Sequence, residues 1–235
     1  MKRVMLKISG EALGGTGKTI DIKTVNQIAL EIKQLYDLGD IAIGIVCGAG
    51  NIWRGRDAIE NGMDRTSADY MGMLGTILNC CALQSALEKL GLETRVLTAI
   101  NVPQIAEPYI RRKADSHLKK GIICIFGGGT GNPYFSTDTC AALRAVELNC
   151  DVILMAKNGV DGIYDSDPRK NKSAKRFEKI KHNEIVEKHL QVMDMTAAAL
   201  CMENDIDIVV FDMNVPGNIA RAAKDYTIGT LVSNK

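Results

Sequence analysis

The sequence predicts an α/β fold, a three-layer αβα sandwich with a mainly parallel central sheet, and three observations support this prediction. Short runs of β-branched and apolar residues recur along the chain, and several are almost continuously apolar, as strands covered on both faces are. Helical patterns lie between these runs. The clearest helical patterns end at glycine, the residue that most readily terminates a helix. Such alternation of strand and helix is typical of a parallel sheet with helices on both faces.

The elements can be assigned in chain order. Strands are expected at 3–9, 41–47, 94–99, 121–126, 151–156, 206–211 and 229–233. The two clearest helices are expected at 22–39 and 66–91. No internal repeat, low-complexity tract or Pro/Ser-rich linker interrupts the alternation, so residues 1–235 are expected to form a single domain with one substantial core.

The composition excludes several classes of protein. Hydrophobic residues make up 46% of the chain and charged residues 24%, which is ordinary for a globular protein and excludes a disordered one. Lys and Arg (29) nearly balance Asp and Glu (28), so there is no general basic field for nucleic acid or an anionic membrane. Lys7 and Glu11 interrupt the apolar stretch that a secretory signal would need. We therefore expect a cytoplasmic protein with no nucleic-acid or membrane partner.

Neither the cysteines nor the histidines predict a metal site. The cysteines show no C-x-x-C spacing and are expected to be small core residues in a reducing compartment; they stand at 47, 80, 81, 124, 140, 150 and 201. The three histidines (117, 182 and 189) are scattered, so no His-based metal site or catalytic triad is expected. No metal-ligating residue is assigned from the sequence.

Four glycine-containing loops follow predicted strands. They read KISGEALGG (7–15), CGAGNIWRG (47–55), GGGTGNPYFSTD (127–138) and KNGVDGIYDSDP (157–168), and the first, second and fourth also bring Lys or Arg. In an open parallel sheet, ligands bind beyond the carboxyl ends of the strands. Glycine-rich turns ahead of helices, with cations beside them, bind phosphate because free N–H groups and the helix dipole supply a positive field. The loops therefore predict a phosphate site.

Alternative interpretations of three segments remain open. The segment 127–138 also fits a strand-to-helix loop, in which Ser136 or its neighbours cap the helix. GGTGKT (14–19) ends like a P-loop, but the first glycine of that motif falls at Ala12 and the glycines do not follow the strand at once. The basic run at 167–177 is either a solvated loop or a cover over bound phosphates. No G-x-G-x-x-G occurs, so no dinucleotide cofactor is expected.

Seven motifs, in order along essentially the whole chain, resemble those of the amino acid kinase family, in the branch that phosphorylates UMP in bacteria. They are KISGEAL, CGAGNIWRG, SADYMGML (67–74), GTGNPYFSTD (129–138), VDGIYDSDP (160–168), VMDMTA (192–197) and FDMNVPG (211–217). The resemblance implies transfer of the γ-phosphoryl group of ATP to UMP, giving UDP and ADP for pyrimidine nucleotide synthesis, with Mg²⁺ accompanying the nucleotide. It also implies a homohexamer, for which the helix at 66–91 could supply an interface. The loop at 14–21 takes the place of an element linked to GTP activation, an allosteric control, in relatives.

The resemblance also implies roles for individual residues. Those implied in catalysis are Lys7, Arg54, Asp138 and Asp194, where Lys7 neutralises charge on the transferring group and the two acids organise the lysine or Mg²⁺. The ATP phosphates would contact Lys7, Ser9, Gly10, Gly50 and Arg54, and the adenosine part Asn158, Tyr164 and Asp167. UMP would contact the Ala49 main chain, Asp69 through its ribose, and Thr130, Gly131, Asn132, Pro133, Tyr134, Phe135, Ser136 and Thr137. The methyl group of Ala49 fits only if its backbone is not left-handed.

The residues leave some roles undecided. Asp69 could instead be an acid favoured by the helix dipole, and Tyr134 and Phe135 could be packing residues. A kinase of the same fold acting on another small molecule, or a nucleotide-binding protein without activity, are the alternative functions. A substrate panel and a test for ADP release would separate them.

Overall fold

The structure is a computed structural model and describes residues 1–15, 17–166, 168, 170–171, 173–188, 190 and 193–234. Its described residues form a nine-stranded sheet of order β4-β3-β5-β2-β1-β6-β8-β9-β7. The strands are β1 (Lys2–Ile8), β2 (Ile41–Cys47), β3 (Thr94–Thr98), β4 (Glu107–Pro108), β5 (Ile123–Gly127), β6 (Val152–Lys157), β7 (Lys179–Ile180), β8 (Asp207–Asp212) and β9 (Thr230–Val232). All seven predicted strands are present, with ends shifted by one or two residues, and the two-residue strands β4 and β7 were not predicted.

The sheet is mainly parallel, as predicted. The central strand β1 pairs in parallel with β2 and β6, which places Lys7 opposite Val46 on one side and Met155 on the other. The β8–β9 pair is antiparallel. Because the central strands run in the same direction, the loops after β1, β2, β5 and β6 meet at one edge of the sheet.

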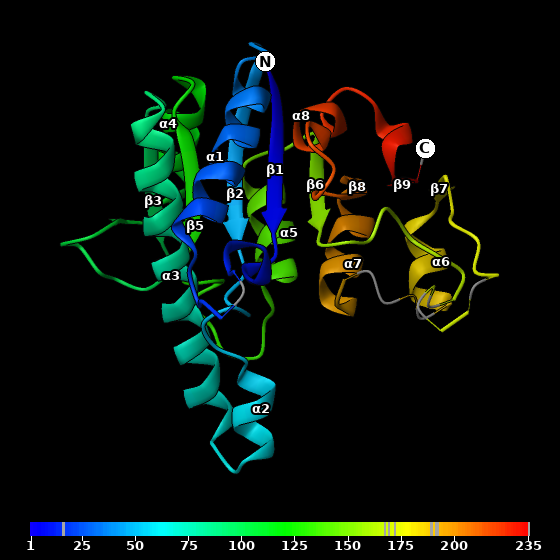
Figure 1. The fold of residues 1–235 in the computed structure, drawn as a ribbon, viewed down its shortest axis with the longest axis horizontal. Helices are drawn as coiled ribbons and strands as arrows, with labels where there is room; N and C mark the ends of the chain where they lie inside the picture. The colour runs from blue at the N-terminus through cyan, green and yellow to red at the C-terminus, as the bar shows by residue number, and fades with distance from the viewer. Residues whose placement is uncertain are drawn as a thin grey trace.

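Helices cover both faces of the sheet and make three layers (Figure 1). One face is covered by α1 (Ile22–Tyr36), α3 (Arg65–Lys89) and α8 (Asn218–Ala222), and the other by α4 (Arg111–Lys119), α5 (Thr137–Glu147), α6 (His182–Glu187) and α7 (Met195–Glu203). Short 3₁₀ helices follow β1 (η1, Gly10–Leu13) and precede β9 (η2, Tyr226–Ile228). In β1, Leu6 and Ile8 pack with α1 and α3, whereas Met5 packs on the opposite face, because side chains alternate along a strand.

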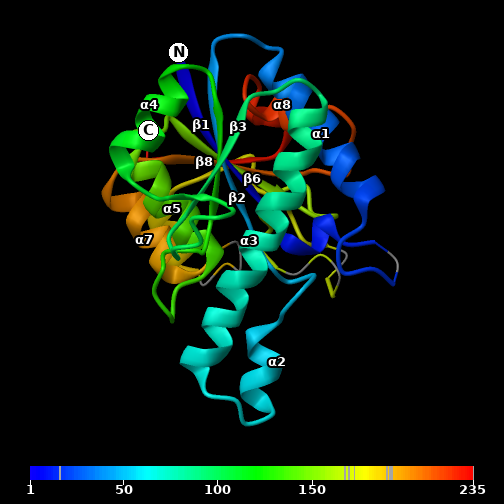
Figure 2. The same cartoon turned by 90° about the vertical axis from the view of Figure 1, so that its left-hand side faces the viewer.

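The helix α2 (Gly55–Glu60) and the first half of α3 extend beyond the sheet (Figure 2). Asp64 starts α3, where its carboxylate accepts a hydrogen bond from the Ser67 backbone N–H at 2.9 Å. Large apolar side chains of α3 are exposed along this extension; they are Tyr70, Met71, Leu74 and Leu78. Across the described ranges, no helix combines the length and the hydropathy that a membrane span requires.

The cysteines are core residues, as predicted. All seven are free thiols, and only Cys81 is not fully buried. Burial raises the pKa of the Cys140 thiol to about 11, so this group stays protonated at neutral pH.

Candidate functional site

The loops after β1 and β2 lie against each other at the predicted phosphate site. A Cβ atom on Gly10 would lie 2.6 Å from the Gly50 nitrogen and 2.7 Å from the Ala49 nitrogen. The Gly48 N–H donates to the Ile8 carbonyl at 2.9 Å. Only glycine at position 10 permits this approach, which brings together the main-chain groups of two loops that the sequence assigned to phosphate binding.

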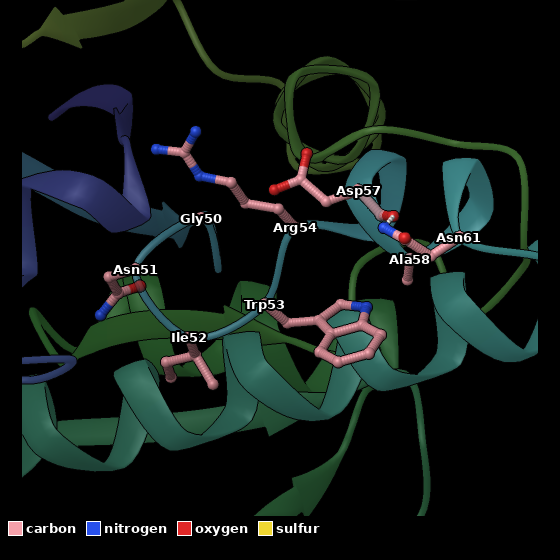
Figure 3. A pocket seen from close by; sticks show the side chains of 8 residues that line it. All are labelled: Gly50, Asn51, Ile52, Trp53, Arg54, Asp57, Ala58 and Asn61. Carbon is pink, nitrogen blue, oxygen red and sulfur yellow. Dashed lines mark hydrogen bonds between the residues drawn. The ribbon is translucent and has the colours of Figure 1, made fainter. Parts of the chain in front are cut away.

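Arg54 is one of the residues that line a pocket of about 380 Å³, together with residues 50–53 and one side of α2 (Figure 3). Its guanidinium extends away from the Trp53 indole, which donates to the Ala68 carbonyl at 2.9 Å. The Arg54 Nη2 atom lies 2.7 Å from Glu11 Oε1, and both side chains are exposed. A phosphate group at this rim would therefore compete with Glu11 for the Arg54 guanidinium.

Ala49 has the backbone that its methyl group requires. The described residues other than glycine that have a positive φ are Tyr134, Asn149 and Asp205, so Ala49 is outside the left-handed region. Its methyl group faces α3, where a Cβ on Gly75 would lie 3.0 Å from the Ala49 Cβ. The loop is thus packed into a gap that a glycine of α3 leaves.

Two asparagines that the sequence analysis missed tie the same loop to α3. Asn79 is fully buried and donates to the Gly48 carbonyl at 2.8 Å. Its side chain also exchanges hydrogen bonds of 2.8 and 3.0 Å with Asn51. The signal that could have found Asn79 is its place in a largely apolar stretch of α3, because a buried polar side chain needs hydrogen-bond partners.

The Lys7 ammonium forms an ion pair with Asp138. Lys7 is only 8% exposed and, by alternation along β1, lies on the same face as Met5, under α5. Asp138 is in the first turn of α5, where the helix dipole favours a negative charge. Burial raises the pKa of Asp138, but the positive charges of Lys7 and Lys157 outweigh it and hold the pKa below its usual value. The carboxylate therefore stays ionised and orients Lys7.

Lys157 is a second cation at this site; the sequence placed it in a glycine-containing loop expected to bind phosphate but gave it no individual role. It ends β6, the strand beside β1, and lies two residues beyond Met155, which is directly opposite Lys7. Both lysines therefore face α5. Burial lowers the pKa of Lys157, and Asp138 partly offsets this. The signal was available in the sequence, since Lys157 adjoins an apolar strand and Lys7 lies within one.

The structure separates the two acids that the sequence could not distinguish. Asp194 caps α7 and accepts hydrogen bonds from the Ser136 hydroxyl and, at 2.9 Å, from Thr139 Oγ1. Ser136 in turn caps α5, accepting from the backbone N–H groups of Asp138 (3.0 Å) and Thr139 (3.1 Å). Asp138 therefore holds Lys7, whereas Asp194 holds the start of α5. The N-cap interpretation of Ser136 is correct, and its hydroxyl is already engaged in these contacts.

The segment 130–137 is anchored from two sides. Three glycines have positive φ here: Gly128 and Gly129 lie between β5 and the segment, and Gly131 lies near its start. The Gly128 N–H donates to Thr76 Oγ1 at 2.9 Å, and the buried Arg144 reaches the Gly129 carbonyl at 3.4 Å. Arg144 was not predicted, because its partner is fifteen residues away in sequence.

Further along the same segment, the predicted UMP residues are partly exposed. The Asn132 N–H donates to Thr130 Oγ1 at 3.2 Å, which closes a turn before Pro133. Tyr134 and Phe135 are exposed and do not pack into the core, so the packing interpretation is wrong for them. A Cβ on Gly48 would lie 3.5 Å from Thr137 Oγ1, so Thr137 borders the phosphate loops.

Asp69 faces the segment 130–137 and does not cap its helix. The cap of α3 is Asp64, whereas Asp69 Oδ2 accepts a hydrogen bond of 2.7 Å from the Tyr134 N–H. The interpretation of Asp69 as a helix-terminus acid is therefore not supported.

The predicted adenosine residues lie after β6. Asn158 Oδ1 accepts from Asn214 at 2.8 Å, and Asp212 Oδ1 accepts from the Gly159 N–H at 3.0 Å. Asn214 and Asp212 were not singled out, although Asp212 ends β8, the strand adjacent to β6, and Asn214 follows two residues later. The Tyr164 hydroxyl donates to Asp161 at 2.7 Å.

The remaining part of the adenosine region is the basic run, and Asp167 lies outside the described residues. Arg176, in the described part of the run, pairs with Asp161 at 3.3 Å. The choice between a solvated loop and a cover over phosphates therefore stays open.

The P-loop alternative is wrong. β1 is followed by η1, not by a glycine-rich turn that opens a helix. Lys18 is 63% exposed and pairs at 3.0 Å with Asp21, the residue that caps α1. Lys18 is therefore on a surface loop, and Lys7 is the buried cation of this region.

Comparisons with known proteins agree with this geometry. The sequence model of the amino acid kinase family matches residues 2–212. A uridylate kinase from Streptococcus thermophilus is 56% identical over 235 residues, which is 100% of this chain and 96% of the relative. Among solved structures, a UMP kinase from Bacillus anthracis matches with a TM-score of 0.96 at 44% identity, covering 100% of this chain and 96% of the other.

Two further solved structures extend the comparison. A UMP kinase from Ureaplasma parvum has a TM-score of 0.94 at 42% identity, with 99% of each chain covered. A uridylate kinase from Archaeoglobus fulgidus has a TM-score of 0.76 at 28% identity, covering 99% of this chain and 100% of the other. The fold and the resemblance inferred from the motifs are thereby confirmed, and the chain belongs to the amino acid kinase family.

Proposed function

We propose that this protein is a nucleoside monophosphate kinase that transfers the γ-phosphoryl group of ATP to UMP, giving UDP and ADP in pyrimidine nucleotide synthesis. The observation that carries the proposal is the 56% identity with a uridylate kinase along the whole chain. Since a fold alone does not determine function, the site must also be able to perform this chemistry.

The chemistry requires positioning and neutralisation of charge. The acceptor is a phosphate oxygen that is already ionised, so no strong general base is needed. Lys7, held by Asp138, would neutralise charge on the transferring group, and Lys157 on the next strand adds a second positive charge. The main-chain groups of the two glycine loops and Arg54 would orient the phosphates for in-line transfer.

Mg²⁺ fits this site as a partner of the nucleotide. The described part of the chain has no cluster of three or more His, Cys, Asp or Glu side chains that could hold a metal. Mg²⁺ bound with ATP does not need one, because it commonly takes one or two carboxylates together with phosphate oxygens and water. Asp138, paired with Lys7, and Glu11, paired with Arg54, are two carboxylates close to the phosphate loops. The ion would neutralise phosphate charge when bound.

We also propose a homohexamer, and the exposed apolar side chains of the α3 extension support a subunit interface there. Seven free cysteines support a reducing, cytoplasmic location. The single sheet supports one domain over residues 1–235. Allosteric control by GTP stays a prediction.

A coupled assay of ADP release with UMP, CMP, dUMP and aspartate tests the proposal. We expect UMP to exceed CMP in kcat/KM by roughly tenfold or more, because a site built for uracil leaves a polar group unpaired against cytosine. Comparable values for the two would contradict a uracil-reading segment. Activity only with aspartate would indicate another kinase of the family, and ATP binding without ADP release would indicate a non-catalytic protein.

A further inference from the structure

Three side chains meet where the segment 130–137 passes the first turns of α3. The Tyr134 N–H donates to Asp69 Oδ2 at 2.7 Å. Arg65, one helical turn before Asp69, places its Nε atom 3.5 Å from the same oxygen. The Arg65 guanidinium also stacks over the Tyr134 ring, 4.5 Å from its centre. Arg65 thus contacts both the acid and the segment that the acid binds.

The backbone of Tyr134 needs these contacts. Its φ is 72°, in the left-handed region that bulky residues avoid. The other described residues of this kind are Asn149 and Asp205, whose side-chain types tolerate that region. A strained conformation of this sort persists only where its surroundings hold it, and such residues cluster at functional sites. At Tyr134 the surroundings include the Asp69 carboxylate and the Arg65 guanidinium.

The two oxygens of Asp69 are used differently. Oδ2 takes both contacts, from the Tyr134 N–H and from Arg65. Oδ1 makes no hydrogen bond to any residue that the structure describes, and a Cβ on Gly55 would lie 3.7 Å from it. One oxygen therefore holds the protein chain, and the other is available to a hydroxyl group of a ligand.

We propose that Arg65 is a positioning residue of the acceptor site. By pairing with Asp69 and stacking on Tyr134, it fixes the carboxylate and the segment 130–137 relative to each other, so that Asp69 Oδ1 faces the acceptor ribose. The inference rests on the proposed function and deepens it, because Arg65 acts through its two partners. Arginine suits the role, since one planar guanidinium stacks on a ring while it pairs with a carboxylate.

The expected effect is moderate because the Arg65 side chain is 52% exposed. Arg65→Ala should raise KM for UMP by about five- to tenfold, the combined size of an exposed cation–π contact and a surface ion pair. The rise should be smaller for dUMP, which lacks the 2′-hydroxyl. KM for ATP should change by less than about twofold, because no hydrogen bond or ion pair joins Arg65 to the described residues of the phosphate loops. Arg65→Lys should recover only part of the loss, since an ammonium cannot stack as a plane.

The experiment measures kcat and KM for UMP, dUMP and ATP on the full-length enzyme, with thermal unfolding as a check on folding. Arg56→Ala is the matched control, because Arg56 is an exposed arginine of α2 and its loss removes the same charge nearby. Tyr134→Gly removes the ring but permits the backbone conformation. Combining it with Arg65→Ala should add little to the larger single effect.

Each result decides the inference. Equal rises in KM for UMP and ATP, fully additive effects of Arg65→Ala and Tyr134→Gly, or a lowered unfolding temperature with unchanged KM would overturn it. A wild-type enzyme that releases no ADP with UMP would contradict the proposed function, and the inference that rests on it. An active wild type whose Arg65→Ala variant is unchanged would contradict the role of Arg65 alone.

Discussion

Gly75→Ala should destabilise this protein, although alanine is the better helix former, and Ala49→Gly should restore the loss. Position 75 is inside α3, where alanine normally gains about 1 kcal/mol over glycine. The new Cβ would lie 3.0 Å from the Ala49 Cβ and 3.6 Å from Ile52 Cβ. Carbon atoms pack best at about 3.5–4.0 Å, so Ala49 and its loop would have to move by several tenths of an ångström.

The magnitudes follow from these contacts. Overpacking costs about 1–3 kcal/mol, which exceeds the gain in helix propensity and leaves Gly75→Ala less stable by about 1 kcal/mol. Ala49→Gly loses a buried methyl group and adds backbone freedom to the unfolded chain, about 1.5 kcal/mol together. In the double variant the methyl group introduced on α3 fills the space that the loop methyl leaves, and the helix gain offsets the loop glycine. The two changes should therefore be coupled by about 2 kcal/mol.

Thermal or urea unfolding of both single variants and the double variant measures this coupling, and KM for UMP reports displacement of the loop. Gly72→Ala is the control on the same helix, since its Cβ would meet only Trp53 Cδ1 at an ordinary 3.7 Å. Gly72→Ala should be neutral or stabilising. The reasoning is refuted if Gly75→Ala stabilises as much as Gly72→Ala does, or if Ala49→Gly does not rescue it.

Three further predictions concern the charged residues of the site. Lys7→Ala should lower kcat by roughly a hundredfold, about 2.7 kcal/mol, whereas Lys18→Ala should leave kcat within about threefold at saturating substrates; the reverse result would contradict the site. Asp69→Asn should raise KM for UMP more than for dUMP, and equal losses would mean that the carboxylate matters only through its bond to the Tyr134 N–H. Because burial lowers the pKa of Lys157, its proton is lost as pH rises through that lowered value, so KM for ATP should rise at alkaline pH earlier than for an ordinary lysine. Lys157→Arg, which does not titrate there, should remove this rise, and an unchanged pH profile would contradict a phosphate-facing Lys157.

Stability should respond to the same two groups in opposite pH ranges. The lowered pKa of Asp138 means that its contribution is complete above the unfolded value, about 3.9, and is lost as pH falls through the folded pKa. The lowered pKa of Lys157 means that unfolding takes up a proton at alkaline pH, so this group favours the folded state more as pH rises from its folded pKa to about 10.4.

Much of the fold could be predicted from the sequence, because a strand that is buried on both faces is recognisable from its own apolar residues. Runs such as 41–47 and 151–156 are apolar throughout, and a strand covered on both sides needs no more than neighbouring residues to be recognised. The two-residue strands β4 and β7 are too short to show an apolar run, and each is defined by its pairing with another strand. Motifs along the chain were also sufficient to identify the family, since they are contiguous in sequence.

Contacts between distant segments were decided only by the tertiary structure. The sequence pointed to Asp138 and Asp194 as acids of the site, but which of them meets Lys7 depends on where α5 and α7 begin relative to β1. Lys157 lies at the site because β6 is the neighbour of β1, and no local sequence pattern specifies the order of strands in a sheet. Arg65 contacts Tyr134 because the tertiary structure places α3 beside the segment that follows β5. Local patterns determine which surfaces are buried and which loops can bind phosphate, whereas the pairing of charges depends on the packing of elements far apart in the chain.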